Sequence, residues 1–131
     1  MKPSMKVGNT ATITFTVASH MQPVFEGDLI HRVCSTWDLA HQFELASRHA
    51  LVPHLEAGEE GIGSRVSIDH KSPAILGSTV EVTATVTKTA ETEVVCNIVA
   101  TIGDRIVATG DQIQRVFPKE KIDQIIANAD N

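Results

Sequence analysis

The stretch that decides the fold runs from Ser35 to His70 and reads STWDLAHQFELASRHALVPHLEAGEEGIGSRVSIDH. It starts with a helical pattern, continues through a glycine-rich turn and ends as a strand. A hydroxyl at Thr36, a carboxylate at Glu44 and an imidazole at His70 are spread over this helix and strand. Acyl-transfer chemistry uses these three side-chain types. The chain after His70 has the pattern of strands, and we expect these strands to form a sheet that holds the helix.

The helix is predicted from an apolar stripe at helical spacing, and it should end near residue 52 because Pro53 follows. Ser35 followed by Asp38 resembles an N-terminal capping box with Asp in the place of the usual Glu. The stripe consists of Leu39, Phe43, Ala46 and Ala50, and it is widened by Ala40, Ser47 and Leu51.

Glu44 lies on the edge of this stripe, between Ala40 and Ser47 on the helix surface. In one interpretation it is an exposed partner of Arg48 at the next turn, a pairing that stabilises a helix by roughly 0.3 kcal/mol. In the other, the carboxylate is drawn towards the core for a chemical purpose. The helical pattern alone leaves both interpretations open.

Alternation of apolar and polar residues predicts five strands, at 10–18, 62–70, 80–87, 93–102 and 105–117. Gly103-Asp104 forms a hairpin turn, Gly110 is a candidate bulge or bend, and 119–129 is a short amphipathic helix. In the second strand the alternation places five residues on the face that should pack on the helix: Ile62, Ser64, Val66, Ile68 and His70.

His70 ends this buried row, so it fits either a hydrogen-bonded core histidine or a catalyst. The irregular segment 20–33 holds one aromatic residue, Phe25, and we expect it to border a pocket. The acidic turn 56–63 lacks the Lys and Ser/Thr of a phosphate-binding loop. Its glycines, Gly63 among them, instead suit a close approach of backbone to a ligand or another chain.

Length and composition fit one globular domain over residues 1–131. The net charge of −5 argues against nucleic-acid binding, and no apolar run is long enough to span a membrane. The N-terminus lacks the apolar segment of a signal peptide, so we expect a cytoplasmic protein with two free thiols, Cys34 and Cys96. Cys96 fits a core residue, whereas Cys34 lies next to the candidate site.

The chain resembles the fluoroacetyl-CoA thioesterase-like family of hot-dog proteins over nearly its whole length. Four positions carry the resemblance: Thr36, then Glu44 eight residues later, then Gly63, then His70 at the end of a strand. Flanking residues agree as well: Pro53, Leu55-Glu56, Gly58-Glu59, Gly77 and the Thr/Val alternation over 79–86.

The resemblance implies an α+β hot-dog fold, in which a five-stranded curved antiparallel sheet wraps one long helix and a short helix ends the chain. It implies an acyl-CoA thioesterase that cleaves a small acyl-CoA to free acid and CoA, with Thr36, Glu44 and His70 as catalytic residues. No metal and no cofactor beyond the CoA of the substrate are expected. The implied partner is a second copy of the chain in a homodimer, or further copies in a tetramer.

Gly63 and Phe25 are the residues expected to contact substrate near the reacting group. Arg65, Lys71 and Arg115 are candidates for the CoA phosphates, although each also fits an ordinary surface charge. The segment before the helix is shorter and poorer in aromatic residues than in family members that act on fluoroacetyl-CoA, so selectivity for a fluorinated substrate is not implied.

Two other functions fit the same residues. A hot-dog hydratase or dehydratase also uses a histidine and a carboxylate on an acyl thioester, and it would hydrate enoyl-CoA without releasing thiol. A non-catalytic acyl-CoA-binding module would bind acyl-CoA without turnover. The spacing of Thr36, Glu44 and His70 favours the thioesterase.

Overall fold

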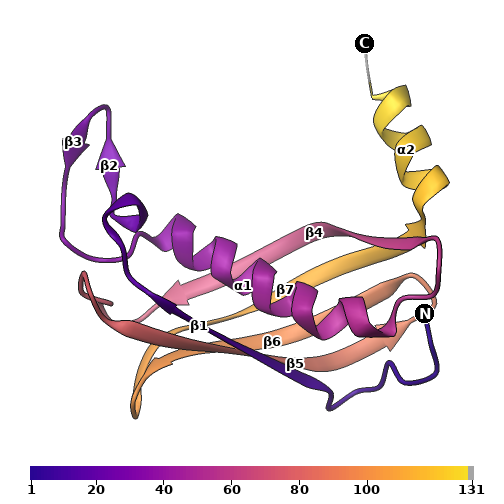
Figure 1. Cartoon of the computed structure of the whole chain (residues 1–131), viewed down its shortest axis with the longest axis horizontal. Helices are drawn as coiled ribbons and strands as arrows, with labels where there is room; N and C mark the ends of the chain where they lie inside the picture. Colours follow the sequence, from indigo (N-terminus) through magenta and orange to yellow (C-terminus); the bar gives the residue numbers. More distant parts are fainter. Residues whose placement is uncertain (130–131) are drawn as a thin grey trace.

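The computed structural model describes residues 1–129, and its main body is a curved sheet around one long helix (Figure 1). Five antiparallel strands form the sheet in the order β1-β5-β6-β7-β4, and helix α1 (Thr36–Leu51) lies in its concave side. The strands are β1 (Thr10–Thr16), β4 (Glu59–His70), β5 (Thr79–Ala90), β6 (Glu93–Ile102) and β7 (Arg105–Pro118). The predicted α+β architecture is confirmed.

Helix α1 forms where the apolar stripe predicts it. Ser35 caps its first turn, since the Ser35 hydroxyl accepts a hydrogen bond from the Asp38 backbone N–H at 3.1 Å. The second half of the predicted capping box is absent, because the Ser35 N–H donates to the Met21 carbonyl instead. After Leu51 the chain continues as a 3-10 turn, η2 (Val52–His54). The stripe is fully buried at Leu39, Phe43 and Ala46 against apolar residues of the sheet.

Strand β4 contains a bulge that changes which residues face the helix. Its pairing with β7 runs from Gly63–Gln114 directly to Arg65–Ile113, which leaves Ser64 as an extra residue. Gly63 therefore faces α1 before the bulge, and His70 faces it after the bulge. The prediction that Ile62 and Ser64 share a face with His70 is wrong, because one extra residue inverts the alternation.

Gly110 is not a bulge, which was one of the two alternatives predicted for it. It pairs regularly with Ile98 and Ile68, and the shift in β7 falls between Ala108 and Ile106 instead. A Cβ at position 110 would overlap the Ser67 backbone carbonyl. Glycine is therefore required there because two strands approach each other closely.

The segment expected to be irregular before α1 contains short elements. A 3-10 turn, η1 (Ser19–Met21), is followed by a two-stranded hairpin of β2 (Val24–Phe25) and β3 (Asp28–Leu29). Its turn uses positive φ angles at Glu26 (51°) and Gly27 (88°), the backbone shape of a tight hairpin. The hairpin stands clear of the sheet at the start of α1 (Figure 1).

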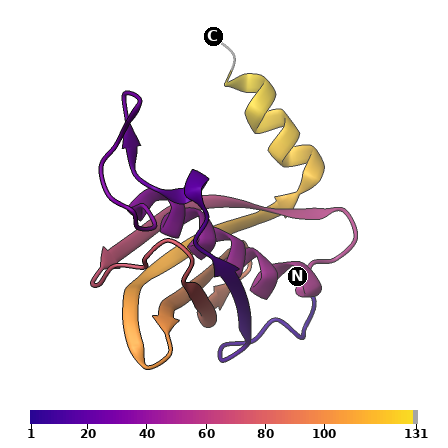
Figure 2. The same cartoon turned by 60° about the vertical axis from the view of Figure 1, so that its left-hand side comes forward.

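Helix α2 (Lys119–Asn128) confirms the short C-terminal helix and projects away from the sheet (Figure 2). Ile122 is buried against the body, whereas Ile125 and Ile126 are exposed. Neither this helix nor any other within residues 1–129 has the length and apolar character needed to cross a bilayer.

Candidate functional site

Thr36 and His70 meet at one end of the molecule, where helix α1 begins and strand β4 ends. Thr36 Oγ1 and His70 Nδ1 are hydrogen bonded at 2.9 Å. The cap at Ser35 fixes the start of the helix, and the Lys71 and Ser72 N–H groups fix the end of the strand by donating to the Val107 carbonyl. The hydroxyl therefore sets the orientation of the imidazole ring.

The other nitrogen of this imidazole is free for chemistry. His70 is half-buried, and its Nε2 is enclosed without a hydrogen-bond partner among residues 1–129. An enclosed polar atom without a partner costs stability unless a ligand or water satisfies it. Nε2 thus retains hydrogen-bonding capacity that a bound molecule could use.

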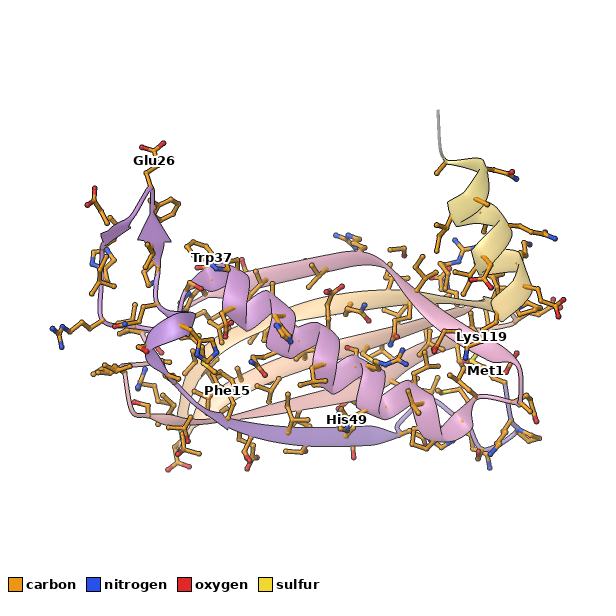
Figure 3. The ribbon with its side chains drawn as sticks, turned by 45° about the horizontal axis from the view of Figure 1, so that its top comes forward. Met1, Phe15, Glu26, Trp37, His49 and Lys119 are labelled. Carbon is orange, nitrogen blue, oxygen red and sulfur yellow. The ribbon has the colours of Figure 1, made fainter. Side chains whose placement is uncertain are left out.

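A cavity of about 350 Å³ lies directly beside the Thr36–His70 pair. The Phe25 ring packs edge-on against the Trp37 ring with centroids 5.3 Å apart, so the hairpin leans on the first turn of α1. Figure 3 shows Trp37 on this turn, beside the hairpin that carries Glu26 at its tip. The cavity is lined by Pro23, Phe25, His31, Val33, Cys34, Ser35, Thr36, Trp37 and His70. Its walls suit an apolar group, with the polar pair at one side.

Glu44 lies further along α1, above Gly63 of strand β4. Glu44 Oε1 is 2.9 Å from the point that a Cβ on Gly63 would occupy, so any other residue at position 63 would shift the carboxylate from this place. Eight residues separate Glu44 from Thr36, which places them about 12 Å apart along the helix axis. In the single chain Glu44 remains exposed.

The interpretation of Glu44 as the partner of Arg48 is wrong. Arg48 instead makes a two-pronged ion pair with Glu60 of strand β4, at 3.1 and 3.2 Å. This pair and a backbone hydrogen bond from the Gly61 N–H lower the pKa of Glu60. None of the ion pairs within residues 1–129 involves Glu44.

Two glutamines beneath α1 were missed by the sequence analysis. Gln112 and Gln114 of strand β7 are only 2% and 4% exposed. Gln112 Nε2 lies 3.4 Å from the same point above Gly63 that Glu44 Oε1 approaches. The signal was present in the sequence, because both residues alternate with Ile113 and Arg115 in a predicted strand.

The structure separates the expected substrate contacts into two groups. Gly63 lies under Glu44, Phe25 lines the cavity, and Lys71 lines a small groove next to His70. Arg65 directly follows the bulge and so points away from the helix side of the sheet. Arg115 is not brought to the site, because it lies near the other end of β7, beside Phe117 and bonded to the Thr92 carbonyl.

Cys34 is not a nucleophile. Burial, reinforced by the negative charge of Asp38 and a hydrogen bond to it, raises the pKa of the Cys34 thiol to about 12, so the thiol stays protonated at neutral pH. Burial also raises the pKa of Cys96, which confirms its place in the core. Both cysteines are free. Residues 1–129 contain no group of three His, Cys, Asp or Glu that could hold a metal ion.

Known proteins match this chain in sequence and in structure. Residues 17–120 match the family model described as fluoroacetyl-CoA-specific thioesterase, FlK. A Thermus thermophilus hypothetical protein, described as a thioesterase superfamily member, is 31% identical with a TM-score of 0.94, over 98% of this chain and 95% of that chain. No protein among curated sequences matches.

Two further solved structures agree with this fold. A Phe-to-Ala variant of the fluoroacetyl-CoA-specific thioesterase FlK is 25% identical with a TM-score of 0.88, over 98% of this chain and 99% of that chain. A hot-dog-like protein from Thermanaerovibrio acidaminovorans is 22% identical with a TM-score of 0.88, over 99% of this chain and 94% of that chain. The second likeness concerns the fold alone.

Proposed function

Because this chain belongs to the fluoroacetyl-CoA-specific thioesterase family and has the hot-dog fold, we propose that it hydrolyses small acyl-CoA thioesters to the free acid and CoA. The observation that carries the proposal is the Thr36–His70 hydrogen bond at the side of an apolar cavity. We assign catalysis to these two residues and Glu44, and substrate contact to Phe25 and Gly63.

The reaction consumes one water, forms a carbon–oxygen bond at the thioester carbonyl and breaks the carbon–sulfur bond. Glu44 acts as the nucleophile, forming an anhydride that water then cleaves, or as the base that deprotonates the attacking water. Both routes give the same products. Either way the carboxylate must be ionised, and the glycine beneath it leaves one side open to the substrate.

The proton for the leaving thiolate comes from His70. His70 takes up a proton from solvent at Nε2, and the resulting imidazolium gives this proton to the sulfur, which returns the ring to its neutral form. In both forms Nδ1–H donates to the Thr36 hydroxyl, so Thr36 fixes the orientation of the ring. The first backbone N–H groups of α1, at Thr36 and Trp37, have no acceptor within the helix and suit the developing oxyanion.

In this scheme the reaction needs no metal, and it needs no cofactor other than the CoA that is part of the substrate. Lys71, in the groove beside His70, is the side chain best placed to contact a CoA phosphate. Arg65 stays a candidate for a CoA phosphate, although its side chain points away from the helix side of the sheet. The two free thiols support a reducing, cytoplasmic setting.

The experiment is a thiol-release assay over acyl-CoAs from acetyl to long-chain and aryl. We expect short acyl groups to be cleaved with kcat/KM of about 10⁴ M⁻¹s⁻¹ or more. A cavity of about 350 Å³ is small for a long chain, so turnover should fall as the chain lengthens. Fluoroacetyl-CoA should show no advantage over acetyl-CoA. Absence of thiol release with every substrate would overturn the proposal.

Strand β4 supports a homodimer. It is an edge strand of 12 residues and contains both Gly63 and His70. Its unpaired edge therefore borders the candidate site. Its apolar side chains Ile62 and Val66, on opposite faces of the sheet, are each 38% exposed and available to a partner. A second copy paired along β4 would cover this edge and close the pocket over Glu44.

Light scattering after size exclusion is therefore expected to give a mass of two chains, or four if dimers pair. On serial dilution, activity should fall in parallel with dissociation because the pocket opens. A monomer that retains full activity would contradict the shared pocket.

A further inference from the structure

Strand β7 carries two polar side chains where its neighbours carry apolar ones. On the neighbouring strand β6, Val94 and Cys96 are buried, at 1% and 0% exposure. The β7 residues paired with them are Gln114 and Gln112. Burying an amide without full hydrogen bonding costs stability that a leucine or methionine would not cost. The two glutamines therefore call for a reason other than packing.

Each glutamine has one buried atom without a partner among residues 1–129: Oε1 of Gln112 and Nε2 of Gln114. Their other amide atoms differ in surroundings. Gln112 Nε2 approaches the space above Gly63, whereas Gln114 Oε1 lies 3.2 Å from the corresponding point above Gly61, which faces the Leu51 side chain. Only Gln112 thus presents its amide to the site.

The space above Gly63 is shared by a donor and an acceptor. Gln112 Nε2 lies 3.4 Å and Glu44 Oε1 lies 2.9 Å from the same point, the missing Cβ of Gly63. Gln112 is held rigidly, since its backbone pairs with Val66 on one side and Cys96 on the other. An amide N–H is the neutral donor that suits a carboxylate oxygen.

From this arrangement we infer that Gln112 is a positioning residue, whose side-chain amide holds the Glu44 carboxylate over Gly63 in the orientation needed for attack on the thioester. The inference rests on the proposed function of Glu44. One carboxylate oxygen is held by the amide, and the other faces the substrate.

Other titratable groups near Glu44 do not serve this purpose. On α1 itself they are His41 and Arg48, and Arg48 is engaged by Glu60 of strand β4. His70, also on β4, is bonded to Thr36, and the buried Cys96 of β6 is a protonated thiol. The helix-facing positions of β1, β5 and β7 carry no titratable side chain beside Glu44.

The test is the steady-state kinetics of Gln112→Met, which keeps the length of the side chain and removes the amide. We expect kcat to fall about tenfold with little change in KM, because the substrate is still bound. Gln112→Glu should lower kcat further, since two carboxylates would then repel each other in one space.

Gln114→Met is the matched control. It removes a second buried amide from the same strand and face, so it should change the melting temperature to a similar extent and leave kcat unchanged. A purely structural role for Gln112 would give the same result for both variants, a changed melting temperature without a lowered kcat, and would overturn the inference.

Failure of this inference is distinguishable from failure of the proposed function. If the wild type hydrolyses acyl-CoA, Glu44→Gln abolishes activity and Gln112→Met keeps the wild-type kcat, only the role of Gln112 is overturned. If Gln112→Met does not fold, Gln112→Glu decides alone: a kcat equal to that of the wild type overturns the inference. If Glu44→Gln remains fully active, the assignment of Glu44 falls and the role of Gln112 falls with it.

Discussion

Glu44→Gln is expected to lower kcat about a thousandfold with every acyl-CoA that the wild type cleaves. The amide has nearly the shape of the carboxylate, so it fits above Gly63 without displacing the helix. It can neither attack the carbonyl nor take a proton from water, and loss of such a group removes most of the rate enhancement. KM and melting temperature should change little. Thiol release under saturating substrate measures the loss.

Glu60→Gln is the control for this variant. Glu60 lies on the same strand as Gly63 and is ion-paired with Arg48, outside the cavity. Its replacement should leave kcat within about twofold, because a surface ion pair contributes little. If Glu44→Gln were as active as the wild type, the assignment of Glu44 as nucleophile or base would be wrong.

His70→Ala is expected to lower kcat by about a hundredfold or more. It removes the proton donor for the leaving thiolate and leaves the Thr36 hydroxyl without its partner. Added imidazole should restore part of the activity, because the vacated space lies beside an open cavity. Such rescue separates a chemical role from a structural one.

Thr36→Ala should lose less than His70→Ala, since the threonine acts by orienting the ring. His54→Ala is the control histidine: His54 is hydrogen bonded to Ser4 near the opposite end of α1. Its removal should leave kcat unchanged. An active, unrescued His70→Ala protein would contradict the assignment of the proton donor.

The helix and its cap could be predicted because their causes are local. The spacing of Leu39, Phe43 and Ala46 defines a buried face whatever lies opposite. The Ser35 hydroxyl reaches an N–H three residues away in the same chain segment. Such features depend on neighbours in sequence, so periodicity and residue type suffice.

The faces of strand β4 could not be predicted correctly. Ser64 is an extra residue in the pairing with β7, and a serine at this position does not by itself predict a bulge. The prediction that His70 faces the helix is nevertheless right, because Val66, Ile68 and His70 all follow the bulge and keep their alternation. The Thr36–His70 hydrogen bond joins residues 34 positions apart, and only the tertiary structure brings those two element ends together.

The glutamines and the ion pair show the limits of spacing rules. Arg48 stands one helical turn from Glu44, yet it pairs with Glu60 across two elements, because that carboxylate offers both oxygens at once. Gln112 is close to Glu44 only because Gly63, on the neighbouring strand β4, leaves space between them. The position of α1 over β4 decides the ion pair, and the register between β4 and β7 decides the surroundings of Gln112. Neither can be read from the sequence.

The most direct test of thioester hydrolysis at this site is a product analysis of an acyl-CoA panel that includes an enoyl-CoA, incubated with catalytic amounts of purified wild-type protein. We predict equimolar free acid and CoA, many turnovers per chain, and loss of both products with Glu44→Gln. Substrate that is bound and stabilises the protein yet stays intact would instead indicate a binding module. A hydrated acyl group still attached to CoA would indicate a hydratase, and either result would contradict the account.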